Sequence, residues 1–274
     1  MIRRSQGERV LLVAGLAAGT LFVFLPLYWM GSSALKTDAE ITASPPTLAP
    51  EAPATENFRA VWRPLLRPGV NSLIVSGSCT VLIVVFRTMA GYVLAKKRFA
   101  GRNAVTALIV GTMLIPPSVL IVPLYCLIVS IGLGDTLTGL VLPFAVTAFG
   151  IFLMRQFAAG IPDELLESAH LDGCSEWTIF WRVIVPLLRG PMAVLAIIEF
   201  VNNWNAFTVP FVLIHSPEKR TLQLALADIR MASEITPWGE VMAAATLTVV
   251  PVIILFLIFQ RRILRSAVSG ALKG

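Results

Sequence analysis

Six stretches of about 20 or more residues are nearly free of charged side chains, and they recur along the whole chain. They cover residues 10–33, 69–94, 104–130, 137–156, 190–214 and 239–261. An α-helix needs roughly 20 apolar residues to cross a hydrocarbon core about 30 Å thick. The sequence therefore predicts an all-α integral membrane protein with six transmembrane helices, forming a single transmembrane domain over residues 1–274.

Composition and charge agree with a membrane protein rather than a soluble one. Charged residues make up 14% of the 274 residues and the mean hydropathy is +0.79, whereas soluble domains carry about 25% charged residues. The net charge of +6 does not indicate nucleic acid, because excess Lys and Arg in an apolar chain usually mark cytoplasmic loops. We expect lipid as the surroundings and no nucleic-acid partner.

The positions of Lys and Arg predict the orientation. If both termini are cytoplasmic, that side receives 14 of these residues and the opposite side receives 7. An excess of positive charge marks the cytoplasmic side, so we predict a multi-pass membrane protein with the N- and C-termini in the cytoplasm. The cytoplasmic set is Arg3, Arg4, Arg9, Lys96, Lys97, Arg98, Arg102, Arg155, Arg182, Arg189, Arg261, Arg262, Arg265 and Lys273.

The residue types that usually support catalysis or metal binding are sparse. The three cysteines are far apart, only two histidines occur, and there is no GxxxxGK[ST] phosphate-binding loop. These residues indicate no structural zinc site and no ATP-binding site in this chain. We predict that the chain is not an enzyme and that it binds no cofactor or metal itself.

The predicted cytoplasmic loop 157–189 has the pattern of a folded element. Pro162 suits the first turn of a helix that should run to about Leu171, and Gly173 can adopt the left-handed conformation that ends it. Ser175 can cap a second helix. The segment is acidic, so anionic lipid would repel it, and we favour a protein-docking role over that of an interfacial amphipathic helix.

The same loop carries a family motif. Glu167-Ser168-Ala169-His170-Leu171-Asp172-Gly173, followed by Ile184-Val185-Pro186, resembles the EAA motif of bacterial ABC-importer permeases. Further fragments along nearly the whole chain resemble the carbohydrate-importer branch, the subunit type of the maltose importer's shorter permease. They include Asn71-Ser72-Leu73, Gly132-Leu133-Gly134-Asp135-Thr136, Trp204-Asn205 and the tail Gly270-Ala271-Leu272-Lys273-Gly274.

The resemblance implies a type I ABC-importer permease fold, a location in the bacterial inner membrane, and a role as a subunit of an ATP-driven sugar importer. It implies four kinds of partner: two copies of a cytoplasmic ATPase that binds ATP and Mg, a second homologous permease, an extracytoplasmic solute-binding protein, and membrane lipid. The EAA loop would be the coupling helix that docks on the ATPase, with coupling residues Glu167, Ser168, Ala169, Leu171, Asp172 and Gly173.

Polar residues inside the predicted spans suggest two further sites. Asn202, Asn203, Trp204 and Asn205 would place three amides and an indole mid-way along the fifth span, a combination that suits a sugar pathway or helix–helix hydrogen bonds. Arg87 and Glu199 each lie roughly 13 Å inside their cytoplasmic helix ends. Unpaired charges are costly there, so we predict an intramembrane ion pair between them or, failing that, a pairing of each with the second permease. Extension of the Arg87 side chain to the lipid headgroups is the alternative.

Other functions remain open on the sequence. Within the importer class, the solute could be a glycerophosphodiester or a polyol instead of a sugar. A stand-alone secondary transporter would also fit six spans, but it would leave the acidic loop without a purpose.

Overall fold

A computed structural model describes residues 6–144, 147–231, 234 and 236–271, and every regular element within them is helical. The chain forms two compact units, residues 1–66 with 225–250 and residues 67–224 with 251–274. Three helices contribute to both units: α3 (Glu56–Lys96), α12 (Leu222–Met231) and α13 (Trp238–Ala271). Of the sequence residues used above to assign orientation and family, Arg3, Arg4 and 272–274 lie outside the described residues.

Within the described residues, four helical segments are long and apolar enough to cross a membrane, or up to six if each of two bent helix pairs forms one span. The four are Leu11–Ser33, Glu56–Lys96, Glu176–Trp204 and Trp238–Gln260. The pairs are Arg102–Thr112 with Pro117–Ser130, bent by 94°, and Leu137–Phe144 with Ala148–Ala159, bent by 45°.

The first bent pair replaces the single continuous helix expected over residues 104–130. α4 (Arg102–Thr112) ends before a turn, and the short helix η1 (Pro117–Leu120) leads into α5 (Ile121–Ser130). Pro116 and Pro117 are responsible, because proline lacks the N–H needed in a helix interior and restricts the residue before it.

The second bent pair consists of α6 (Leu137–Val141), η2 (Leu142–Phe144) and α7 (Ala148–Ala159), and the span Glu176–Trp204 consists of α9 (Glu176–Ile179), a π-helical turn (Phe180–Ile184) and α10 (Val185–Trp204). The other helices are short: α2 (Asp38–Thr42), α8 (Glu164–Leu171), α11 (Thr208–Leu213) and η4 (Pro217–Lys219). The fifth predicted span, 190–214, differs from the structure because α10 ends at Trp204 and α11 begins separately at Thr208.

The first unit begins with α1 (Gln6–Ser33), whose apolar stretch is not buried. The turn that follows α1 is held by side-chain contacts. The Lys36 side chain is buried, its ammonium donates to the carbonyl of Thr47, and it lies 4.7 Å from the centroid of the Trp29 ring. The Asp38 carboxylate accepts the N–H of Gly239, at 2.7 Å, which joins this turn to the start of α13.

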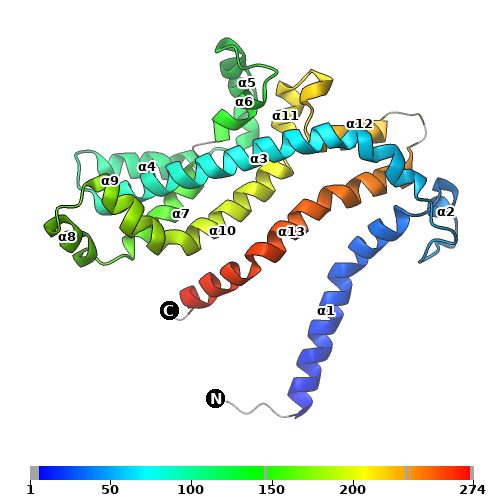
Figure 1. Ribbon diagram of the computed structural model, residues 1–274, viewed down its shortest axis with the longest axis horizontal. Coiled ribbons are helices and arrows are strands. Elements are labelled where there is room, and N and C mark those ends of the chain that lie inside the picture. The colour runs from blue at the N-terminus through cyan, green and yellow to red at the C-terminus, as the bar shows by residue number, and fades with distance from the viewer. Residues whose placement is uncertain (1–5, 145–146, 232–233, 235, 272–274) are drawn as a thin grey trace. The chain divides into compact units, whose positions relative to one another are not determined.

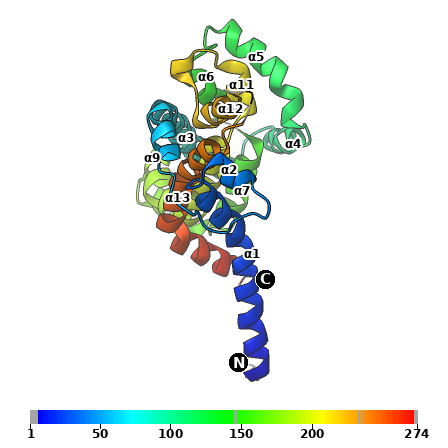
Figure 2. The ribbon, with the colours of Figure 1, turned by 90° about the vertical axis from the view of Figure 1, so that its right-hand side faces the viewer.

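The second unit has two apolar clusters. One contains Tyr92 of α3, Met154 of α7, Leu166 of α8 and Leu195 of α10, so it fixes α8 to three longer helices. The other joins α3 to α6 and α11 through Ile83, Leu140 and Leu213, among others. Figure 1 shows α8 and α9 beside the C-terminal end of α3, whereas α5, α6 and α11 lie away from that end. Figure 2 shows α5, α6 and α11 gathered together.

Candidate functional site

The predicted docking loop forms a helix, a glycine turn and a second helix, as the sequence indicated. α8 ends at Leu171 and Gly173 has φ +75°, a left-handed conformation that favours glycine. The N–H of Cys174 donates to Ala169 O at 3.0 Å, which closes the turn, and the Ser175 hydroxyl accepts the N–H of Thr178 to cap α9. The helix begins at Glu164, two residues later than Pro162 suggested.

α8 has one buried face and one exposed face. Leu166 and Ala169 are only 7% and 9% exposed and pack into the apolar cluster that includes Tyr92 and Met154. Leu171 is 88% exposed. The buried face fixes the helix to its own unit and leaves the opposite face available to a partner.

This geometry changes which residues of α8 are available to a partner. The resemblance placed Ala169 among the coupling residues, but its side chain is buried within this chain. Glu167, Ser168, Leu171 and Asp172 are exposed, and so is Leu165, which the sequence reasoning missed. The signal available in the sequence was helical spacing. Leu165, Ser168 and Leu171 follow one another at intervals of three residues, which places them on neighbouring positions of one side of a helix.

Two lysines at the end of α3 bind the segments on either side of α8. The Lys96 ammonium donates to Ile161 O and, at 2.5 Å, to the Asp163 carboxylate. The Lys97 ammonium forms an ion pair with the Glu176 carboxylate. The hydrogen bond from Lys96 lowers the pKa of Asp163, an exposed carboxyl group outside the spans. The sequence reasoning had used both lysines only to assign orientation.

Arg87 of α3 and Glu199 of α10 are brought together in a buried ion pair. The Arg87 side chain is 0% exposed and that of Glu199 is 11% exposed. A second guanidinium nitrogen of Arg87 donates to Phe144 O, at 3.1 Å, just before the break between η2 and α7. Gly150 of α7 packs so closely that a Cβ there would lie 2.2 Å from Arg87 Cδ. The pair therefore joins three parts of the second unit.

The four residues suggested for a substrate pathway do not form one cluster. Asn202 and Asn205 are exposed, but Trp204 is buried and its ring stacks on Phe200 at 5.7 Å between centroids. The Asn203 amide donates to Glu199 O, at 2.7 Å, within its own helix. The residues also lie at the C-terminal end of α10 rather than mid-way along a span, so the predicted position was wrong.

Asp135 is a polar hub that the sequence reasoning did not single out. Its carboxylate accepts the N–H groups of His215 and Ser216 and the Ser216 hydroxyl, and Lys219 lies 3.3 Å away. These hydrogen bonds, that of the Ser216 hydroxyl first, hold the pKa of Asp135 well below its usual range. The hub joins the turn before α6 to the segment after α11.

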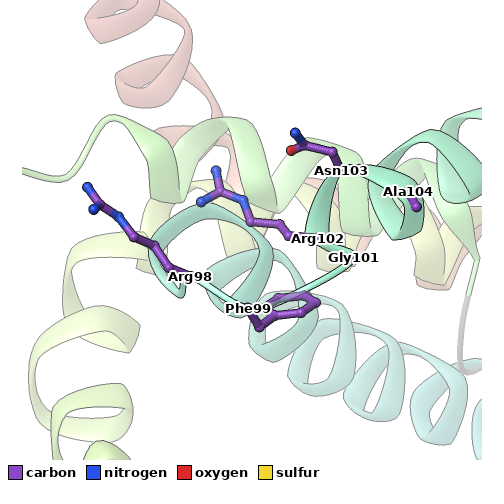
Figure 3. A pocket seen from close by; sticks show the side chains of 6 residues that line it. All are labelled: Arg98, Phe99, Gly101, Arg102, Asn103 and Ala104. Carbon is purple, nitrogen blue, oxygen red and sulfur yellow. The ribbon is translucent and has the colours of Figure 1, made fainter.

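The turn between α3 and α4 forms an open, basic pocket of about 440 Å³. The side chains of Arg98 and Arg102 extend to the same side of the turn and Phe99 extends to the other (Figure 3).

Among the residues that the structure describes, no group of three His, Cys, Asp or Glu side chains is placed to hold a metal ion.

Comparison with known proteins identifies the family. Residues 87–268 match the family model described as the binding-protein-dependent transport system inner membrane component. The chain belongs to this family. It is therefore a permease component of a transport system rather than an enzyme, and a multi-pass membrane protein.

Three relatives illustrate the range of the family. The chain is 36% identical over 208 residues to the arabinooligosaccharides transport system permease protein AraQ of Bacillus subtilis, covering 74% of this chain and 72% of the relative. It is 31% identical over 282 aligned positions to the sn-glycerol-3-phosphate transport system permease protein UgpE of Yersinia pestis, covering 98% and 99%. It is 31% identical over 259 residues to the diacetylchitobiose uptake system permease protein NgcG of Streptomyces coelicolor, covering 93% and 85%.

Solved structures show the same fold. A chain of a bacterial ABC transporter involved in the import of the acidic polysaccharide alginate superposes with a TM-score of 0.83 at 22% identity, covering 95% of this chain and 99% of that one. A chain from the alginate transporter in complex with an alginate pentasaccharide-bound periplasmic protein gives a TM-score of 0.62 at 16% identity. The fold is that of a type I ABC-importer permease.

Proposed function

We propose that this chain is one of two permeases in an ATP-driven sugar importer, with α8 as the element that docks on a cytoplasmic ATPase. The observation that carries the proposal is the construction of α8. Its inner face is packed into the core of its unit, while its outer face presents apolar Leu165 and Leu171 beside acidic Glu167 and Asp172. A helix packed in this way can transmit a displacement imposed by the ATPase to the membrane helices, because its inner face is packed against α3, α7 and α10.

The chain contributes no nucleotide chemistry in this scheme. ATP and Mg bind to two ATPase subunits, and closure of the ATPase pair displaces α8. ATP hydrolysis biases transport only through that mechanical contact, which favours one of two states of the pathway. A second permease supplies the other half of the pathway, and an extracytoplasmic solute-binding protein delivers the solute.

The orientation follows from the same proposal. The ATPase is cytoplasmic, so α8, Lys96, Lys97 and both termini lie on the cytoplasmic side, in agreement with the distribution of Lys and Arg. The unburied apolar surface of α1 then faces lipid or the second permease.

Sugar as the solute is supported by the relatives named for arabinooligosaccharides and diacetylchitobiose. Within this chain, Asn202 and Asn205 are exposed amides three residues apart on one side of the end of α10. Amides hydrogen-bond sugar hydroxyls as both donors and acceptors. We assign these two residues, rather than Asn203 or Trp204, to the substrate pathway.

Affinity purification from native membranes in mild detergent, followed by mass spectrometry, tests the assembly. We expect an ATPase in two copies and a second permease to accompany the chain. A lone chain or a homo-oligomer that still transports solute after reconstitution would overturn the proposal.

The solute is tested by uptake into proteoliposomes containing the purified complex and its binding protein. We expect oligosaccharide uptake that requires ATP and falls in the Asn202→Ala and Asn205→Ala variants. ATP-dependent uptake of a glycerophosphodiester or a polyol, with no sugar uptake, would contradict the sugar assignment while keeping the importer.

A further inference from the structure

Consecutive lysines bind both flanks of α8. Lys96, the last residue of α3, contacts Ile161 and Asp163, which precede α8. Lys97, the next residue, contacts Glu176, which follows the Gly173 turn. The end of one membrane helix therefore fixes the start and the finish of the helix that the proposed function assigns to ATPase docking.

The two lysines lie in different surroundings. The Lys96 side chain is 7% exposed and reaches out to Asp163, which is 72% exposed. The Lys97 side chain is 30% exposed and its partner Glu176 is 56% exposed. Ile161, whose carbonyl Lys96 also binds, is part of the apolar cluster beneath α8. The Lys96 contact is anchored in the core, whereas the Lys97 contact lies at the surface.

Glu176 connects α3 to α8 as well as to α9. Its carboxylate accepts from the Tyr92 hydroxyl, at 3.5 Å, besides Lys97, and both of these residues come from the end of α3. His170, in the last turn of α8, lies 3.5 Å from the same carboxylate. The Glu176 side chain thus contacts both α3 and α8, the two helices whose relative position matters for coupling.

The contact at Lys97 lies at the outer edge of the packing between α3 and the π-helical turn, where the ring centroids of Tyr92 and Phe180 are 5.9 Å apart. A cavity of about 330 Å³ lies beside it, lined by side chains of α3, α9 and the π-helical turn: Met89, Tyr92, Val93, Lys97, Glu176, Trp177 and Phe180. The π-helical turn Phe180–Ile184 follows directly, and such turns occur frequently at functional sites. The ion pair is therefore a second link between the end of α3 and the start of α9, outside this aromatic contact.

We propose that Lys96 and Lys97 are positioning residues that transmit the displacement of α8 to α3, with Lys96 as the fixed point and the Lys97–Glu176 pair as the adjustable one. This inference rests on the proposed docking of α8 on an ATPase. The lysines are not ATPase contacts themselves, because their ammonium groups bind within the chain. Removal of these lysine side chains uncouples ATP hydrolysis from the conformational change of the translocation pathway, while the permease and the ATPase stay assembled.

The test uses the purified native complex in proteoliposomes, with uptake per ATP hydrolysed as the readout. In the Lys97→Gln variant we expect this ratio to fall at least about fivefold while the same amount of ATPase co-purifies. Lys97→Arg should keep most of the ratio, and the double variant Lys97→Glu with Glu176→Lys should recover it. Arg189→Gln is the matched control, since it removes one positive charge from an exposed position of α10 and should leave the ratio unchanged.

Two results would overturn the inference. An unchanged ratio in Lys97→Gln would show that the contact transmits nothing, and loss of the ATPase from the variant complex would show that Lys97 serves docking instead. Failure of the proposed function gives a different result, because the wild-type complex would then contain no ATPase at all.

Discussion

The helix α3 and the residue directly after it carry charges in two contrasting settings. Arg87 is fully buried and held by Glu199 and a backbone carbonyl, whereas Lys97, ten residues further on, faces a carboxylate that is more than half exposed. In the apolar interior, removing one partner leaves the other charge without water or a counter-ion. At the end of α3, water can solvate Lys97 or Glu176 when the partner of either is removed. We infer that the buried Arg87–Glu199 pair stabilises the fold. The exposed Lys97–Glu176 contact positions the start of α9 relative to α3 and contributes little to the free energy of unfolding.

The largest expected effect comes from breaking the buried pair. Glu199→Gln or Arg87→Met should each lower the free energy of unfolding by about 3–5 kcal/mol, because one charge remains buried and uncompensated. Denaturant unfolding of the full chain in detergent micelles measures the change. The double variant Arg87→Met with Glu199→Met should recover most of the loss, and losses that simply add would contradict the pairing.

A smaller loss is expected when the guanidinium is displaced without changing any charge. Gly150→Ala places a Cβ 2.2 Å from Arg87 Cδ, and overpacking of this kind costs about 1–3 kcal/mol. Gly77→Ala in α3 is the matched control, since nothing lies within 4 Å of a Cβ at that position. The same unfolding measurement should show no loss for the control, and equal losses in the two variants would remove the argument for close packing on Arg87.

A still smaller effect on stability is expected at the exposed pair. Lys97→Gln should change the free energy of unfolding by about 1 kcal/mol or less, as exposed ion pairs do. Unfolding of this variant beside Glu199→Gln, in one detergent, makes the comparison direct. A loss at Lys97 as large as that at Glu199 would show that both pairs maintain the fold.

The smallest expected effect is that of mild acid on Asp163. Its pKa is lowered in the folded chain, so its contribution is complete above the ordinary value of about 3.9 and is lost only as the pH falls through the lower, folded value. The difference in unfolding free energy between wild type and Asp163→Asn should therefore be the same at pH 7.5 and pH 5. A difference that shrinks by pH 5 would contradict the bond to Lys96.

Features encoded by local residues were predictable from the sequence. The turn at Gly173 and the cap at Ser175 need only local backbone chemistry, and the helical rise places Arg87 and Glu199 at matching depths. Features that depend on which faces meet were not predictable. The burial of Trp204 and Ala169, and the contacts of Lys96 with Ile161 and Asp163, depend on how distant segments pack, which a single sequence does not specify.

Photo-crosslinking at Leu171 tests the docking of α8 most directly. A photoreactive amino acid replaces Leu171, which is 88% exposed on α8, and in a second sample Leu114, which is 83% exposed between α4 and η1. After irradiation of native membranes, we predict an adduct between the ATPase and position 171, and none from position 114. Adducts from position 171 that contain only lipid, or ATPase adducts of equal yield from both positions, would contradict the assignment of α8 as the coupling element.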